Sequence, residues 1–143
     1  MTGFTETQRF PVVAYGALGL SAVAVAVAIA EAGLAWPVLP LGLALNLLCL
    51  RTVTTERELV VTLGALFPLY RRRIPLAEIT GAEAVTYSPL ADYGGWGIRW
   101  GRNGAAVNAR GSRGVLLTLR GGKRLLIGSQ RPDALAAALT APR

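Results

Sequence analysis

The sequence predicts a two-helix transmembrane hairpin followed by an all-β domain, a sandwich or partly open barrel of about seven strands with a C-terminal helix. Residues 10–50 form two long apolar runs separated by a short break, whereas residues 51–143 consist of short alternating segments bounded by glycine and proline. An apolar helix of about 20 residues crosses about 30 Å of hydrocarbon, and period-two alternation is typical of strands. We therefore predict a tail and membrane hairpin at residues 1–50 and a soluble domain at residues 51–143.

The first apolar run, at residues 10–30, is predicted to be a retained membrane span. It is longer than the apolar core of a signal peptide, and a second apolar run follows it directly. Its SAVAVAVAIA stretch alternates like a strand, but an isolated strand in lipid would leave its backbone groups without partners. We therefore expect a helix.

The second apolar run, at residues 34–50, is predicted to be the second span. Asn46 is its one strongly polar side chain, and we expect it to hydrogen-bond to the first helix or to a second copy of the chain. Arg9 precedes the first span, Arg51 follows the second, and the connection between the spans has no basic residue. The positive-inside rule therefore predicts a multi-pass protein with both termini in the cytoplasm.

Seven strands and a closing helix are predicted in the soluble domain. The strands are expected at residues 52–55, 59–63, 66–74, 83–87, 96–100, 115–119 and 124–128, and the helix is expected to begin at Pro132. Val115, Leu117 and Leu119 share one face of their strand, which we expect to point into the core. Gly121-Gly122 indicates a tight hairpin between the last two strands. Residues 88–95 are expected to form a loop.

Basic residues are concentrated in the soluble domain, where 14 Lys and Arg residues accompany six Asp and Glu residues. Nucleic acid is a general partner for basic chains. A domain held beside a cytoplasmic leaflet, however, already lies in the negative surface potential of anionic lipids. We therefore expect the membrane bilayer as a partner, with anionic phospholipids as candidate ligands, and no nucleic acid. The alternative is that these charges only orient the protein in its membrane.

Arg71, Arg72 and Arg73 form the first candidate binding surface. Arginine binds phosphate through two parallel hydrogen bonds from its planar guanidinium group. Because side chains alternate along a strand, at most two of the three can meet the same phosphate while the other points to the opposite face. The alternative interpretation is a solvated positive patch.

Tyr93, Trp96, Arg99 and Arg102 form the second candidate surface, around a glycine-rich stretch. Glycine allows the backbone to approach a ligand closely, and the aromatic side chains can supply a binding face. The alternative is that Trp96 and Trp100, which are spaced as on one strand face, belong to the core.

Enzyme chemistry is not predicted. The chain has no histidine and a single cysteine, Cys49, and no pair of carboxylates or activated serine stands out in its motifs. We therefore expect no catalytic residues, no cofactor and no metal.

The chain resembles the bacterial PH-like proteins, which are small membrane proteins with a PH domain beside their spans. The resemblance covers essentially the whole chain and rests on two N-terminal spans followed by the motifs LYRRRIPLAEI, YSPLADYGGWGIR, GSRGV and LLIGSQRPDAL. It implies a PH-like β domain, a location in the bacterial inner membrane, and binding to lipid, peptide or protein. We expect a non-enzymatic scaffold with a protein partner or self-association. The alternatives are a sensor of anionic lipid headgroups and, less favoured, an unrecognised enzyme.

Overall fold

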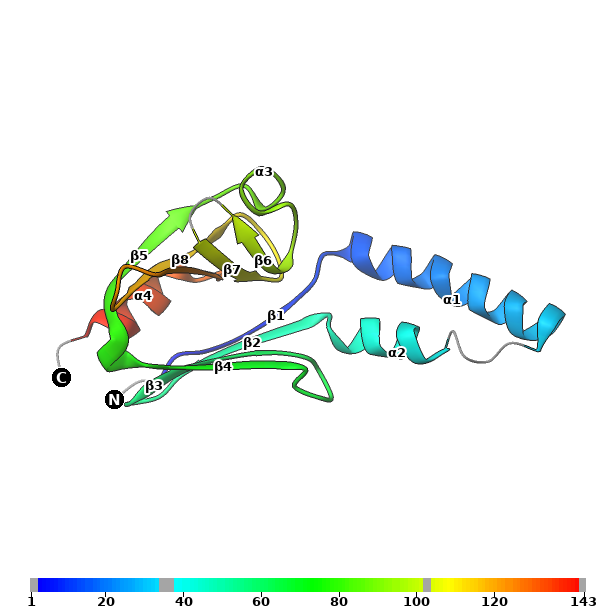
Figure 1. The fold of residues 1–143 in the computed structure, drawn as a ribbon, viewed down its shortest axis with the longest axis horizontal. Helices are drawn as coiled ribbons and strands as arrows, with labels where there is room; N and C mark the ends of the chain where they lie inside the picture. The colour runs from blue at the N-terminus through cyan, green and yellow to red at the C-terminus, as the bar shows by residue number, and fades with distance from the viewer. Residues whose placement is uncertain (1–2, 34–37, 102–103, 142–143) are drawn as a thin grey trace.

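The computed structural model describes residues 3–33, 38–101 and 104–141, which form a helical hairpin, two β-sheets and a C-terminal helix (Figure 1). The first sheet has the order β1-β2-β3-β4, with strands Thr5–Arg9, Cys49–Thr54, Glu58–Leu63 and Tyr70–Pro75. The second has the order β5-β8-β9-β7-β6; in chain order its strands β5 to β9 are Ile79–Thr86, Gly97–Gly101, Gly104–Asn108, Arg113–Leu119 and Arg124–Gly128. The helices are α1 (Val12–Ala32), α2 (Val38–Asn46), the 3-10 turn η1 (Leu76–Glu78), α3 (Pro89–Tyr93) and α4 (Pro132–Thr140).

The two sheets enclose the main hydrophobic core. Leu50, Leu59 and Val61 of the first sheet belong to the same buried cluster as Val115 and Leu117 of the second. The predicted inward face of residues 115–119 is confirmed, because Val115, Leu117 and Leu119 are all buried. Helix α4 packs against β5 and β8, and its residues Leu135 and Leu139 complete this core.

The described residues contain nine strands rather than the seven predicted. Strand β1 was missed because TETQR carries polar side chains on its buried face as well as on its exposed face, so no apolar alternation marks it. Strand β7 was missed because its first residues, Gly104 to Ala106, resemble a turn in composition, and it pairs in parallel with β9. The predicted strand at 66–74 begins only at Tyr70, after a loop that contains Pro68.

The predicted loop at residues 88–95 contains the short helix α3. The hydroxyl of Ser88 caps this helix by accepting a hydrogen bond from the amide of Ala91 at 3.3 Å. The carboxylate of Asp92 accepts one in return from the amide of Ser88 at 2.7 Å. These reciprocal bonds satisfy backbone donors at the helix start, where the helix itself supplies no acceptors.

Helix α1 is apolar and fully outside the core. It has 21 residues, which corresponds to about 31 Å. An 18-residue stretch of it has a mean hydropathy of 2.3, and the structure buries none of its residues. Among residues 3–33, 38–101 and 104–141 it is the one helix long and apolar enough to cross a membrane. The structure therefore shows an exposed apolar helix near the N-terminus.

The prediction of a second full span at residues 34–50 is not met in the described part of this segment. Helix α2 has nine residues, which is about 14 Å, and the chain is already in strand β2 at Cys49. Leu50, which the prediction placed in the membrane, is completely buried in the core between the sheets. The protein core, and not lipid, therefore explains why this position is apolar. Residues 34–37, with Trp36, lie outside the described residues.

The hairpin leaves the first sheet and returns to it at the same end. Strands β1 and β2 are antiparallel neighbours, with Arg9 opposite Cys49, and the amide of Phe10 donates to the carbonyl of Leu48 at 3.1 Å. Figure 1 shows α1 and α2 projecting together from this end, away from the β domain and from both chain termini. Both ends of the helical segment are therefore fixed at one position.

Candidate functional site

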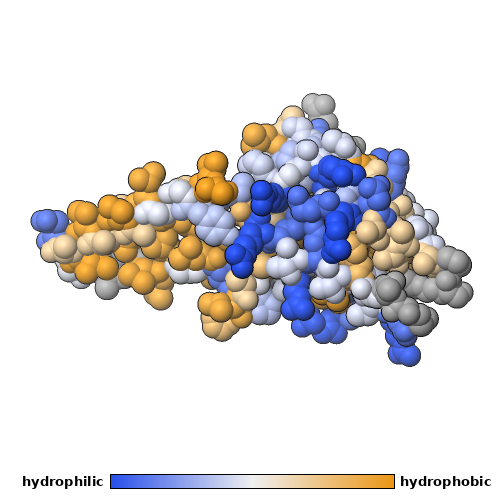
Figure 2. Space-filling view, turned by 180° about the vertical axis from the view of Figure 1, so that it is seen from behind, coloured by the Kyte–Doolittle hydropathy of each residue, from blue (hydrophilic) through white to orange (hydrophobic). Residues whose placement is uncertain are grey.

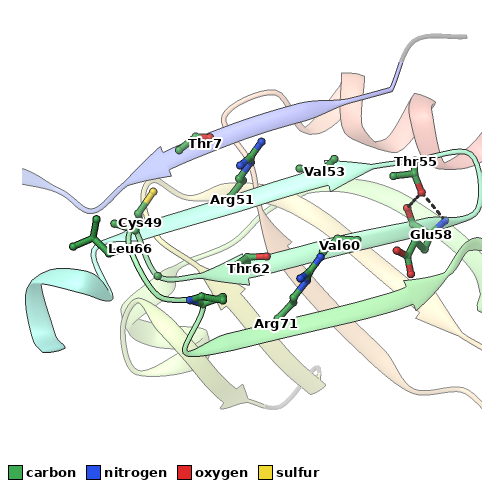
Figure 3. A pocket seen from close by; sticks show the side chains of 13 residues that line it. Thr7, Cys49, Arg51, Val53, Thr55, Glu58, Val60, Thr62, Leu66 and Arg71 are labelled. Carbon is green, nitrogen blue, oxygen red and sulfur yellow. Dashed lines mark hydrogen bonds between the residues drawn. The ribbon is translucent and has the colours of Figure 1, made fainter.

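The outer face of the first sheet, which points away from the core, forms a shallow groove of about 620 Å³ (Figure 3). We call it the outer-face groove. Its lining includes side chains from all four strands, among them Thr7, Arg51, Val60, Thr62 and Arg71, and one end of it is formed by the loop that follows β3.

Strand register brings two arginines into one row across this groove. Thr7 lies opposite Arg51, Arg51 opposite Thr62, and Thr62 opposite Arg71. Because neighbouring strands lie about 4.8 Å apart, the backbones at Arg51 and Arg71 are separated by about 10 Å, with Thr62 between them. Figure 3 shows Arg51 extending toward β1 and Arg71 leaning from β4 over β3. The row therefore presents two guanidinium groups and two hydroxyl groups to the same space.

The groove is electrostatically positive. Glu58 is the only acidic side chain among the described residues that line it, and it lies toward the β2–β3 turn, where its backbone bonds to Thr55. Arg9 and Arg73 belong to the same face, because each is paired in register with a groove residue, Cys49 and Val60 respectively. The outer face thus carries four arginines.

The predicted arginine cluster is divided between the two faces of β4. Arg71 lines the groove and Arg73 shares its face, whereas Arg72 is paired with the buried Val61 and lies on the inner face. Sequence reasoning did not identify Arg51 as a candidate, because Thr7 on β1 and Arg71 on β4 are 44 and 20 residues away from it in the chain and only the sheet register brings them together.

The second predicted surface does not form a single face. Tyr93 is buried in a small second cluster with Tyr87, and their rings meet edge to face at 5.9 Å. Trp96 is half-buried, and Arg99 is exposed and donates from Nε to the carbonyl of Trp96 at 3.1 Å. Arg102 lies outside the described residues.

Burial also affects the ionisation of the two tyrosines. Desolvation raises the pKa of the Tyr87 hydroxyl above its ordinary value, and the adjacent Asn108 side chain partly offsets this rise. Desolvation likewise raises the pKa of Tyr93, with a further rise from the charge of Asp92. A tyrosine held neutral in a packed cluster is typical of a structural role.

The alternative interpretation, in which Trp96 and Trp100 both belong to the core, is wrong for Trp100. Its side chain is 78% exposed. The reason is the position of β6 at the edge of the second sheet, next to β7 only, so that no further strand covers Trp100 near the strand end.

The chemistry available in the outer-face groove is anion binding. Guanidinium groups donate charge-assisted hydrogen bonds, and threonine hydroxyls can add neutral ones. Within residues 3–33, 38–101 and 104–141, no three His, Cys, Asp or Glu side chains are grouped so that they could hold a metal ion. No protein-family model matches this chain, and no curated protein sequence matches it either.

Proposed function

We propose that this chain is a non-enzymatic, membrane-anchored binding module whose β domain is of the PH-like type. The observation that supports anchoring is helix α1, which is long enough to cross hydrocarbon and has no residue buried by the rest of the protein. An exposed apolar surface of this size is stable in lipid and costly in water. Figure 2 shows the apolar colouring concentrated on this helical projection, while the β domain is mostly hydrophilic.

In this proposal the β domain lies against the cytoplasmic surface of a bacterial inner membrane. A chain that enters the bilayer through α1 must return to its starting side, because β1 and β2 are neighbours in one sheet. Arg9 and Arg51 flank the hairpin on that side, as the positive-inside rule requires of the cytoplasmic face.

The ligand that best fits the outer-face groove is the phosphate of an anionic lipid headgroup. The groove begins at the end of the sheet where the hairpin is attached, since Cys49, the first residue of β2, lines it. Arg51 follows two residues later, which is about 7 Å along the strand. Arg51 and Arg71 would therefore lie close enough to the leaflet surface for its negative potential to act on them.

Each arginine near an anionic surface contributes about 1 kcal/mol of binding free energy. Arg51 and Arg71 together would therefore favour an anionic over a zwitterionic headgroup by up to about 30-fold. This part of the proposal makes the protein a lipid-binding module at the inner leaflet. It gives the groove a specific ligand and does not require a second protein.

A protein partner is the second candidate, and Trp100 is the observation that favours it. An exposed tryptophan on an edge strand offers both a large apolar contact and unpaired backbone groups to an incoming strand. This surface is on the second sheet and does not involve the groove. A scaffold function would therefore use Trp100, whereas headgroup binding would use Arg51 and Arg71.

Spin-labelled lipids can test the headgroup proposal with the full chain in vesicles. The fraction of motionally restricted label gives the association of phosphatidylglycerol relative to phosphatidylcholine. We expect the chain to prefer phosphatidylglycerol and the double variant Arg51→Gln/Arg71→Gln to lose most of that preference. The matched control is Arg110→Gln/Arg120→Gln, which removes the same charge from exposed positions outside the groove.

The control should retain the preference, and high salt should weaken it in the unaltered chain because ions screen exposed charges. An equal loss in both double variants would show that net charge, rather than the groove, attracts anionic lipid. An unchanged preference for phosphatidylglycerol in the groove variant would contradict headgroup binding at Arg51 and Arg71.

A further inference from the structure

The loop between β3 and β4, residues 64–69 (the β3–β4 loop), exposes a cluster of large apolar side chains. Leu66 is 82% exposed, Phe67 71% and Leu69 49%. The sequence contains no charged residue between Glu58 and Arg71, so the apolar character continues from the strands into the loop. Surface loops are normally polar, and a cluster of this kind marks a contact with another apolar phase.

Every backbone N–H group of this loop is satisfied within the protein. Gly64 donates to the carbonyl of Cys49 at 2.9 Å, Ala65 to the carbonyl of Asn46 at 2.8 Å, and Leu69 to the carbonyl of Phe67 at 2.9 Å. Pro68 has no N–H group. The two remaining amides, Leu66 and Phe67, are bound by a side chain.

That side chain is Asn46, at the end of α2. Its Oδ1 accepts from the amide of Leu66 at 2.7 Å and of Phe67 at 3.0 Å, and its Nδ2 donates to the carbonyl of Phe67 at 2.7 Å. The partners of Asn46 within the chain are therefore in this loop and not in the first helix, as one of the two expectations had it. Asn46 instead holds the β3–β4 loop beside the base of the hairpin.

A loop in water has no need for such complete pairing, because water satisfies exposed amides. In a nonpolar environment each unpaired amide is costly, so only a backbone with internal partners can enter it. Apolar side chains that point outward and amides that are all paired inward are the two properties that a loop needs at the boundary of a bilayer.

We infer that the β3–β4 loop inserts its side chains into the headgroup–hydrocarbon boundary of the membrane that holds α1. The inference deepens the proposed function and rests on its anchoring part. Asn46 links the loop to the anchor, since it ends α2, which lies beside α1, and binds the loop directly. In Figure 1 the β3–β4 loop projects from the sheet on the same side as α2, and in Figure 2 apolar colour reappears at the corresponding place beneath the helices.

This second contact fixes the orientation of the β domain. A hairpin alone would allow the sheet to tilt relative to the surface, whereas a contact at the β3–β4 loop holds the adjacent part of the groove, with Leu66 and Arg71, against the leaflet. The loop would therefore set the depth at which the groove meets headgroups.

Nitroxide accessibility in the full-length chain tests this inference. In a Cys49→Ser background, single labels are placed at Phe67→Cys in the loop, Leu20→Cys in α1 and Lys123→Cys in the exposed turn before β9. The chain is reconstituted in vesicles of phosphatidylcholine with phosphatidylglycerol. Collisions with oxygen, which concentrates in lipid, are compared with collisions with a water-soluble nickel chelate.

We expect the oxygen-to-nickel ratio at position 67 to exceed that at position 123 severalfold and to lie below that at position 20. A label at Leu66→Cys should give the same result, which would show that the label at position 67 does not itself disturb the loop.

A water-like ratio at 67 with a lipid-like ratio at 20 would overturn the inference and leave the anchor intact. A water-like ratio at 20 would instead contradict the proposed anchoring. Spin–spin broadening at 67 that disappears on dilution with unlabelled chain would assign the loop to a second copy and also overturn the inference.

Discussion

The carboxylate of Glu6 accepts a 2.6 Å hydrogen bond from the hydroxyl of Ser129, although the two residues are 123 positions apart. Both are buried, and Glu6 also accepts from the amide of Gln130 at 2.7 Å. Strand β1, which carries Glu6, leads directly into α1. The segment before the apolar helix is therefore part of the β domain and is fixed to the residues that precede α4.

Replacement of Glu6 should destabilise the β domain. Glu6→Ala leaves the buried Ser129 hydroxyl and the Gln130 amide without their acceptor, and we expect the free energy of unfolding to fall by about 2–3 kcal/mol. Urea unfolding of the full chain in detergent micelles measures this change. The control Glu83→Ala, at an exposed position on β5, should change it by less than about 0.5 kcal/mol. Equal effects of the two variants would contradict a structural role for the Glu6–Ser129 bond.

Replacement of Asn46 should release the β3–β4 loop. Asn46→Ala removes the acceptor of two amides and the donor to one carbonyl, so we expect a loss of stability of about 1–3 kcal/mol. The nitroxide at position 67 should also become more mobile and less accessible to oxygen. Asn46→Asp retains both acceptor contacts and should lie between the unaltered chain and Asn46→Ala. A label at 67 that is unaffected by Asn46→Ala would show that the loop is held in another way.

The buried tyrosines predict a stability loss at alkaline pH. Because burial raises the pKa of Tyr87 in the folded state, the folded protein keeps this proton after the unfolded chain has released it. The folded state then binds more protons, so the free energy of unfolding falls as pH rises. The loss begins near the ordinary tyrosine value of about 10 and continues through the raised pKa of the folded state.

The variant Tyr87→Phe removes this titration. We expect its urea midpoint to fall less steeply than that of the unaltered chain between about pH 9 and pH 11. Part of the decline in the urea midpoint should remain in this variant, because burial also raises the pKa of Tyr93. Identical slopes for the variant and the unaltered chain would contradict the assigned contribution of Tyr87.

Much of the β domain could be predicted from local pattern. Alternation at residues 115–119 identified an inward face, Gly121-Gly122 indicated the last hairpin, and Pro132 marked the start of the closing helix, all as observed. These features depend on neighbours in sequence. Strand β1 could not be found in this way because the partners of its buried polar residue Glu6 lie near the other end of the chain.

The candidate site was less accessible to sequence reasoning for the same reason. Alternation predicted that the arginine triplet divides between two faces, but the meeting of Arg51 and Arg71 depends on the register of three strands. Apolar composition was also ambiguous, because Leu50 in the core and the exposed residues of α1 have similar hydropathy. The second span was overestimated on that account. Asn46 was placed in a membrane contact, although its partners are backbone groups of a loop about 20 residues later.

The most direct test of the account is sequential washing of membranes from cells that produce the full-length chain. High salt releases proteins held by charge alone, and concentrated urea releases proteins held by a folded soluble surface. Because α1 would lie in hydrocarbon, we predict that the chain stays in the membrane pellet through both washes and is released only by detergent. Recovery of the chain in the salt or urea supernatant, without detergent, would contradict the account.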